Sequence, residues 1–207
     1  MKKHSLPASS TGVAAVAATL TTHSAAPVGA VADLVQRLRA GDRDTRGDAW
    51  QNAGPVGAPA VGPLSDLLTD PDFEVARSAK RALWQIVHHA GRPGAEAEAR
   101  AVERALLPLL EHFAAAVRRE VLWMLSEIGS AAAVGAMARR LRDREARDDA
   151  RMALQRIPGP EATQALQTAL QTAPEEFRPP LAEALRKRGV KMRDYPARKL
   201  VPGERPV

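Results

Sequence analysis

The 207-residue sequence contains no cysteine. Disulfides, thiolate nucleophiles and cysteine-ligated zinc or iron–sulfur sites are therefore excluded. Aromatic residues make up only 3% of the chain, so leucine, alanine, valine, isoleucine and methionine must fill the interior, and such side chains suit closely stacked helices. No apolar run reaches the roughly 18 to 20 residues that a membrane-spanning helix needs.

Motifs of the common catalytic and cofactor sites are also missing. The sequence has no phosphate-binding loop, no G-x-S-x-G elbow, no dinucleotide fingerprint and no H-E-x-x-H. His88 and His89 are adjacent, so on a helix they diverge by about 100° and do not form a metal-ligand pair. We therefore expect no enzyme, no catalytic residue, no cofactor and no metal site.

Basic residues are in excess, and their position along the chain decides whether the excess indicates a nucleic-acid-binding surface. The formal charge is +6 and the isoelectric point is near 10.3. Of the 30 basic residues, two precede residue 31 and five follow residue 189, whereas two of the 24 acidic residues lie in these ends. Residues 31–189 therefore carry a charge near +1, which does not describe a nucleic-acid groove.

The two ends differ from this body. Residues 1–30 combine Lys2 and Lys3 with an apolar, alanine-rich stretch and small residues before position 31, the three parts of a secretory signal. A flexible tail is the alternative, so localisation stays open between the cytoplasm and export. Residues 190–207 contain three prolines among charges and show no helical period, which predicts an irregular, exposed, basic tail.

An internal repeat fills residues 31–189. Five segments share apolar residues at helical spacing, with reference positions 30, 42, 29 and 31 residues apart. The shared columns are Thr45, Val75, Val117, Ala146 and Phe177; then Ala49, Ala79, Val121, Ala150 and Leu181; then Ala53, Leu83, Leu125, Leu154 and Leu185. These columns predict five buried helix faces.

A second set of columns precedes each reference position and predicts a partner helix. Its leucines stand eleven and seven residues earlier, except in the fourth repeat, where Met137 and Leu141 are two residues closer and indicate a shortened turn. The leucines are Leu34, Leu64, Leu106 and Leu166, with Leu38, Leu68, Leu110 and Leu170. Asp42, Asp72 and Asp143 stand three residues before the reference column, where we interpret them as N-caps.

This pattern, an aspartate at the turn followed by Val-Arg and then Ala and Ala-Leu, resembles HEAT repeats and the short HEAT-like repeats named after phycobilisome lyases. The resemblance covers about residues 31–189 and implies a right-handed α-solenoid of about five helical hairpins. The second helices are then expected to line a concave face. It also implies that a repeated arginine pairs with a turn aspartate. That arginine is present in four repeats, and Ala76 replaces it in the second; the four are Arg46, Arg118, Arg147 and Arg178.

Positions two, five, six and nine after the reference column point away from the predicted core. They hold all three tryptophans and several arginines, the composition that interface hot spots favour. The positions include Trp50, Arg77, Lys80, Arg81, Trp84, Arg119, Leu122, Trp123, Ser126 and Arg151. We expect a protein partner to bind at Arg77, Arg81, Trp84, Arg119 and Trp123. Packing between repeats is the competing interpretation of the tryptophans, and we favour it for Trp50.

Two other functions remain open. Nucleic-acid binding through the same arginines and tryptophans is the alternative to protein binding. Alkyl-base DNA glycosylases built from HEAT-like repeats place aromatic residues and an acid in a cationic groove, a role for which Asp148 stands on the outward positions. The nearly neutral body argues against both. The insertion that begins at Gly91 is interpreted as slack between repeats two and three rather than as a recognition feature.

Overall fold

A computed structural model describes residues 28–196, and within that range the chain forms ten α-helices and no strand. The α-helices are α1 (Val28–Leu38), α2 (Arg43–Gln51), α3 (Val61–Leu67), α4 (Phe73–Ala90), α5 (Glu96–Leu106), α6 (Ala115–Ile128), α7 (Ala131–Arg139), α8 (Arg147–Arg156), α9 (Pro160–Thr172) and α10 (Arg178–Lys187). Short 3-10 helices lie at Gly54–Val56, Ala58–Ala60, Leu107–Glu111, Arg140–Arg142 and Glu175–Phe177.

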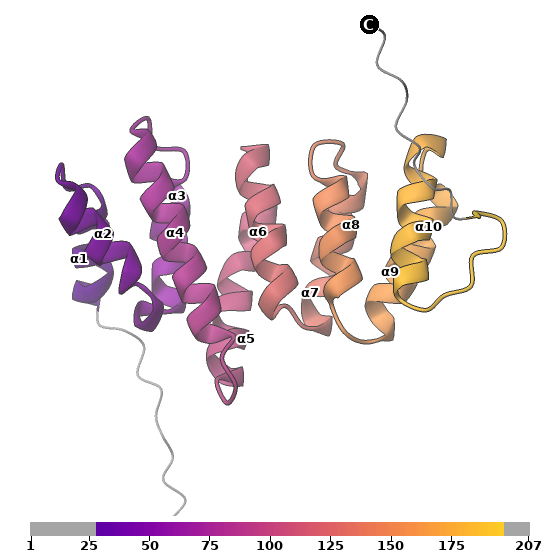
Figure 1. The fold of residues 1–207 in the computed structure, drawn as a ribbon, viewed down its shortest axis with the longest axis horizontal. Coiled ribbons are helices and arrows are strands. Elements are labelled where there is room, and N and C mark those ends of the chain that lie inside the picture. Colours follow the sequence, from indigo (N-terminus) through magenta and orange to yellow (C-terminus); the bar gives the residue numbers. More distant parts are fainter. Residues whose placement is uncertain (1–27, 197–207) are drawn as a thin grey trace, which may run out of the picture.

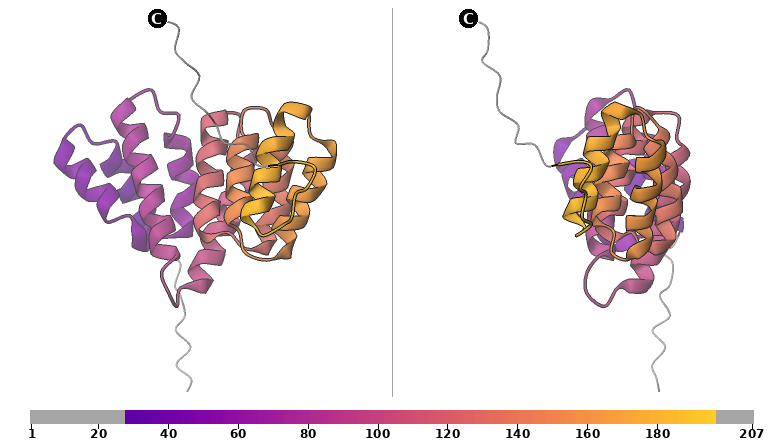
Figure 2. Two further views of the ribbon diagram at one scale, coloured as in Figure 1. Left: turned by 45° about the vertical axis from the view of Figure 1, so that its right-hand side comes forward. Right: turned by 90° about the vertical axis from the view of Figure 1, so that its right-hand side faces the viewer.

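The helices form five consecutive hairpins that stack in a row, which confirms the predicted α-solenoid (Figure 1). The first helices α1, α3, α5, α7 and α9 form one layer, and the second helices form the other; the two layers are visible end-on in Figure 2. Each second helix packs against the next, α2 against α4, α4 against α6, α6 against α8, and α8 against α10. None of the helices in residues 28–196 is both long and apolar enough to span a membrane.

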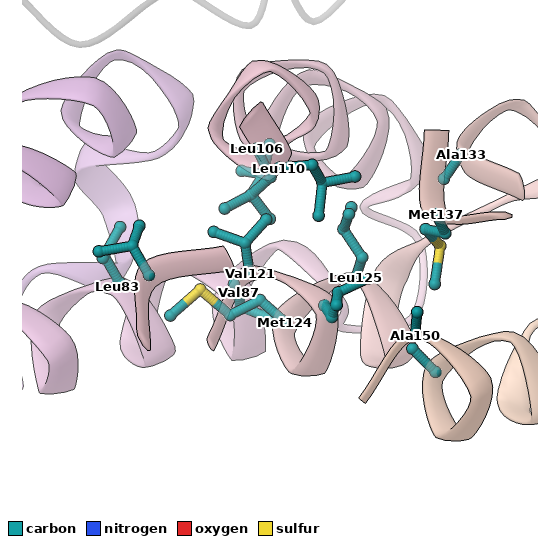
Figure 3. Packing of buried hydrophobic residues seen from close by; sticks show 14 of the residues in the cluster. Leu83, Val87, Leu106, Leu110, Val121, Met124, Leu125, Ala133, Met137 and Ala150 are labelled. Atoms are coloured by element: carbon teal, nitrogen blue, oxygen red, sulfur yellow. The ribbon is translucent and has the colours of Figure 1, made fainter. Parts of the chain in front are cut away.

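One continuous apolar core runs between the two layers, and the predicted columns form it. Every member of the two columns that begin with Ala49 and Ala53 is buried, with at most 2% of its surface exposed. Leu83, Val121 and Leu125 point into the space between the layers, toward first-helix residues such as Leu106 (Figure 3). Three members of the predicted columns are only half-buried: Thr45 in the reference column, and Leu68 and Leu170 in the first-helix column. Because each hairpin covers its neighbour's face, the core spans all repeats.

Two of the three predicted N-caps are confirmed. The Asp42 carboxylate accepts the Thr45 backbone N–H at 2.7 Å at the start of α2. The Asp72 carboxylate accepts the Glu74 N–H at 2.8 Å at the start of α4. These bonds satisfy amides that the helix itself leaves free.

The prediction for Asp143 was wrong, since α8 begins only at Arg147 and has no side-chain cap. Asp143 instead ends a 3-10 turn, and its carbonyl accepts the Ala146 N–H at 3.0 Å. α8 thus begins one residue after the reference position Ala146, whereas α2, α4 and α6 begin two residues before theirs. This leaves the carboxylate free to contact the preceding repeat.

Arg118 and Asp143 form a buried ion pair between repeats three and four. The guanidinium Nε lies 2.8 Å from the carboxylate, and the side chains are 10% and 16% exposed. Arg118 also donates to the carbonyls of His112 and Phe113 at its own turn. The hydrogen bond to Asp143 raises the pKa of Arg118. Burial opposes ionisation of Asp143, but its hydrogen bonds to Arg118 and to the Glu145 N–H outweigh burial and lower its pKa.

The repeated arginine makes this aspartate pair only once in the described chain. Arg147 contacts Glu176 of the next repeat at 3.3 Å, whereas Arg46 and Arg178 donate to carbonyls at their own turns. Ala76 has no such group, as the sequence predicts for repeat two. Arg39 nevertheless contacts Asp70 at 3.0 Å, so the turns of the first two hairpins are still joined by an ion pair.

Gly129, between α6 and α7, is fixed by a close backbone approach. A Cβ atom there would lie 2.4 Å from the Leu125 carbonyl oxygen and 2.9 Å from the Ile157 side chain. Both distances are shorter than van der Waals contact, so no larger residue fits without movement of the end of α6. This glycine lets α6 turn directly into α7.

The last hairpin is closed by Arg188, which follows α10. Its guanidinium donates to four carbonyls at the end of α8 and the start of α9, those of Leu154, Gln155, Ile157 and Gly159, and its Nε donates to the Thr163 hydroxyl. Burial lowers the pKa of Arg188. The chain then loops back to α10 without helix: Val190 and Met192 pack against the core, and Arg186 donates to the Tyr195 carbonyl.

Candidate functional site

The five residues predicted to bind a partner all lie on neighbouring second helices. Arg77, Arg81 and Trp84 come from α4, and Arg119 and Trp123 come from α6, which packs directly against α4. The side chains of Arg77 and Arg119 are 48% and 56% exposed, and both tryptophans are half-buried. The two sets therefore adjoin on the second-helix layer.

A groove of about 660 Å³ follows α4 between Trp50 of α2 and the first turn of α6. Arg77, Arg81 and Trp84 line it, whereas Arg119 and Trp123 do not. Its other lining residues are Trp50, Leu68, Phe73, Ala76, Lys80, Gln85, His88, Ala116, Val117 and Glu120. Phe73, at the first position of α4, is 72% exposed. The groove thus has an apolar floor with basic side chains along α4.

Glu120 of α6 holds the far side of this groove. One carboxylate oxygen accepts the indole Nε1–H of Trp84 at 2.5 Å, and the other lies 2.7 Å from the Lys80 ammonium. The Trp84 ring also contacts the His88 ring, with centroids 5.4 Å apart. The hydrogen bond fixes the orientation of the indole and leaves its ring to line the groove.

The same arrangement recurs one junction further along, between α6 and α8. The Asp149 carboxylate accepts the Trp123 Nε1–H and the Arg119 Nε–H, each at 2.8 Å. Asp149 is buried with only 8% of its surface exposed. Trp123 and Arg119 are therefore held against α8 by a charge-assisted hydrogen-bond pair, and this part of the predicted site also joins two repeats.

Trp50 and Arg81 connect α2 with α4 in a different way. The guanidinium carbon of Arg81 lies 5.1 Å from the centre of the Trp50 ring, a cation–π distance. A second groove of about 840 Å³ lies between these two helices and also includes Arg43, Asp44, Asp48 and Glu74. Acids and bases nearly balance in that groove. Arg81 and Trp50 line both grooves, so they stand at the boundary between them.

Sequence reasoning missed the two acids that organise this face. Glu120 and Asp149 stand three residues after the reference column, and Asp48 occupies the same position in repeat one. Only Ser78 interrupts the column in the first four repeats. The recurrence of an acid at that position is the sequence signal that could have identified them. Leu122 and Ser126, predicted to point outward, are buried because a solenoid helix contacts neighbours on both sides.

The acids and histidines of the described residues bear on metal binding and on catalysis. No group of three or more His, Asp or Glu side chains there is arranged to hold a metal ion. Asp148, the acid considered for a glycosylase role, is exposed and pairs with Arg151 at 3.1 Å one turn away. His88 and His89 lie in the last turn of α4.

A comparison with protein families agrees with the repeat architecture over part of the chain. Residues 102–186 match a protein family described as HEAT repeats. A comparison with curated proteins gives no match. Among solved structures, an engineered protein is 24% identical, with 76% of this chain and 78% of that chain covered and a TM-score of 0.39. A designed armadillo repeat protein in complex with the peptide (KR)4 is 21% identical, with 77% and 82% covered and a TM-score of 0.42.

Proposed function

We propose that this HEAT-like repeat solenoid is a non-catalytic scaffold that binds a protein partner on the second-helix face of repeats two and three. The observation that carries the proposal is the groove along α4, which combines exposed and half-buried aromatic rings with arginines. Aromatic and guanidinium groups of this kind release water on binding at low conformational cost. Arg77, Arg81 and Trp84 line the groove, and Arg119 and Trp123 extend the face toward α8.

The rigidity of this face supports the proposal. Glu120 holds Trp84, and Asp149 holds Trp123, so both rings are fixed before any partner arrives. A partner then loses less free energy to side-chain ordering than it would on a mobile surface. The same hydrogen bonds join neighbouring repeats, which means that the tryptophans serve packing and recognition together.

Nucleic-acid binding is the competing function because the chain carries a charge of +6. That charge lies mainly at the ends, and Asp149 and Glu120 neutralise bases on the face itself. Phosphate binding is driven by the release of counterions from many phosphates, and only Arg81 and the weakly paired Arg77 remain for it on this face, which favours a protein partner.

The test uses the full chain fixed to a resin and cell extract treated with or without nuclease. Arg77→Glu combined with Arg81→Glu reverses charge on the proposed face without cutting either tryptophan hydrogen bond. Arg156→Glu, on α8, is the matched control outside the groove. We expect the double variant to lose the captured protein, the control to retain it, and nuclease to have no effect. Capture that disappears with nuclease supports nucleic acid, and equal capture by all forms places the site at the Gly91 turn or in the tails.

A further inference from the structure

We infer that the groove along α4 receives a peptide segment carrying an aspartate or glutamate side chain beside a large apolar side chain, with Arg81 binding the carboxylate. This inference rests on the proposed function and adds the chemistry of the partner. It depends on three features of the described residues: the contacts of Arg81, the apolar wall of the groove and the balance of charge along it.

Arg81 differs from the other bases of the face because no carboxylate or carbonyl within residues 28–196 accepts a hydrogen bond from it. Its guanidinium carbon instead lies over the Trp50 ring, 5.1 Å from the ring centre. Lys80 and Arg119 are in ion pairs at 2.7 and 2.8 Å with acids on the next helix. Arg81 is nevertheless half-buried. A half-buried guanidinium without an acceptor has unused hydrogen-bonding capacity at this groove.

Stacking on Trp50 prepares Arg81 for a carboxylate. The ring covers one face of the planar guanidinium, while the N–H groups point outward in the plane and stay available. A planar fork held in this way matches the two oxygens of a carboxylate, which it binds with two parallel hydrogen bonds. Because the stack restricts the side chain beforehand, less entropy is lost when the acid binds.

An apolar side chain next to that carboxylate would be accommodated by the groove. Trp84, Leu68 and Val117 line the groove, as do Ala76 and the exposed Phe73 nearer the start of α4. The volume of about 660 Å³ exceeds that of a single side chain, so a few residues of a peptide fit. Small Ala76, where other repeats carry arginine, opens the wall at this repeat.

The charge along the groove favours an acidic occupant. Its lining contains Arg77, Lys80 and Arg81 against a single acid, Glu120, which already contacts Lys80 and Trp84. Arg77 reaches only Glu74 on its own helix, at 3.4 Å in an exposed pair that contributes little. Two cationic groups therefore remain for the ligand, and a basic segment would be repelled.

The test selects dodecapeptides from a random phage-displayed library on the full chain and measures the affinity of the enriched sequences as synthetic fluorescent peptides. We expect Asp or Glu within two positions of a Leu, Ile, Phe or Trp. Arg81→Gln should weaken binding about 10- to 100-fold, the range that a charged hydrogen bond supplies. Arg156→Gln, which removes an exposed arginine that pairs with Glu127 on another part of the face, should leave affinity unchanged. In a ¹H–¹⁵N spectrum the peptide should shift the indole signals of Trp50 and Trp84 but not that of Trp123.

The outcomes separate this inference from the proposed function. Enriched peptides without acids, or acidic peptides that bind Arg81→Gln as tightly as the natural chain, overturn the carboxylate site. If those peptides still shift the Trp84 signal, the groove remains a binding site. Failure to enrich any sequence overturns the inference of a short acidic segment. Whether a protein partner binds this face is then decided by the resin test with the Arg77→Glu and Arg81→Glu variant.

Discussion

Single arginine side chains join the hairpins at several points, and two of them, Arg118 and Arg188, are each held by several acceptors. Arg118 reaches an acid of the next repeat and two carbonyls of its own turn, and Arg188 reaches back to four carbonyls and a hydroxyl. A planar fork with five donors can satisfy several turn carbonyls at once, which lysine cannot do. Turns that leave carbonyls free are therefore closed by arginines that lie on other elements of the fold.

Gly129→Ala tests the close approach between α6 and α7. The added methyl would meet the Leu125 carbonyl at 2.4 Å, so we expect a loss of about 1 to 3 kcal/mol in the free energy of unfolding, measured by urea denaturation. Gly135→Ala is the matched control, because it lies within α7 with nothing within 4 Å of the new Cβ. It should stabilise by up to about 1 kcal/mol. Equal effects of the two changes would contradict the packing described at Gly129.

Asp143→Asn tests the ion pair with Arg118. A carboxyl whose pKa is lower in the folded state than its ordinary value of 3.8 adds stability above that value, and the contribution is lost as pH falls through the folded pKa. The natural chain should therefore lose stability from about pH 4 downward. At pH 7 the free energy of unfolding of the variant should be lower by about 2 kcal/mol, but it should fall less than that of the natural chain as the pH is lowered. Thermal melting between about pH 7 and about pH 2.5 measures both slopes, and parallel slopes would exclude Asp143 as the source.

At the scale of helices, stability resides in the columns shared by the second helices. Leu83→Ala and Leu125→Ala each remove buried methyl groups from the middle of the stack, where both residues are at most 1% exposed. We expect each to destabilise the chain by about 2 to 4 kcal/mol in chemical denaturation. Arg104→Ala, an exposed change on α5, is the control and should stay within about 0.5 kcal/mol. Comparable losses in all three would mean that the buried face is assigned incorrectly.

The sequence was sufficient for these columns because helical phase alone tells which side of each helix is apolar. Residues at four-residue spacing, such as Val75, Ala79 and Leu83, must share a face whatever the helix packs against. Phase does not tell how a helix is placed against its neighbour. The Trp84–Glu120 and Trp123–Asp149 bonds cross from one repeat to the next, over 36 and 26 residues, so their partners could not be identified from one sequence.

The groove along α4 shows the same limit. Arg77, Arg81 and Trp84 were predicted on one side of one helix, and the structure brings them together there. The contribution of Trp50 from the preceding repeat and of Glu120 from the next depends on the twist between hairpins. The twist is set by all the packing at a junction. The sequence therefore predicted on which side of the helix these residues lie, but not which residues of neighbouring repeats line the groove or accept hydrogen bonds there.

For the molecule as a whole, charge is separated between body and ends. Five bases lie outside residues 28–196, and the variant that tests their role replaces each with glutamine; they are Lys2, Lys3, Arg198, Lys199 and Arg205. We expect any affinity for double-stranded DNA in a gel shift to vanish in this full-length variant, because fewer phosphates are then neutralised and fewer counterions are released. Submicromolar binding retained at physiological salt would instead place a nucleic-acid site on the body and support the competing function.

The two ends of the solenoid are joined to the stack by different contacts, so we expect them to resist a stretching force unequally. In α2 only Ala49 is buried, and the first junction is joined by the Arg81–Trp50 contact and the Arg39–Asp70 ion pair. Arg188 instead fastens the last hairpin with five hydrogen bonds. Hairpins contact only their neighbours, so a stretching force can detach them one at a time. Held in optical tweezers by its two ends, the chain should lengthen first by the first hairpin, at the lowest force, and last through the Arg188 end. A partner bound across Trp50 and Arg81 would bridge the junction that we expect to open first. Its dissociation would then lower the force needed to detach the first hairpin.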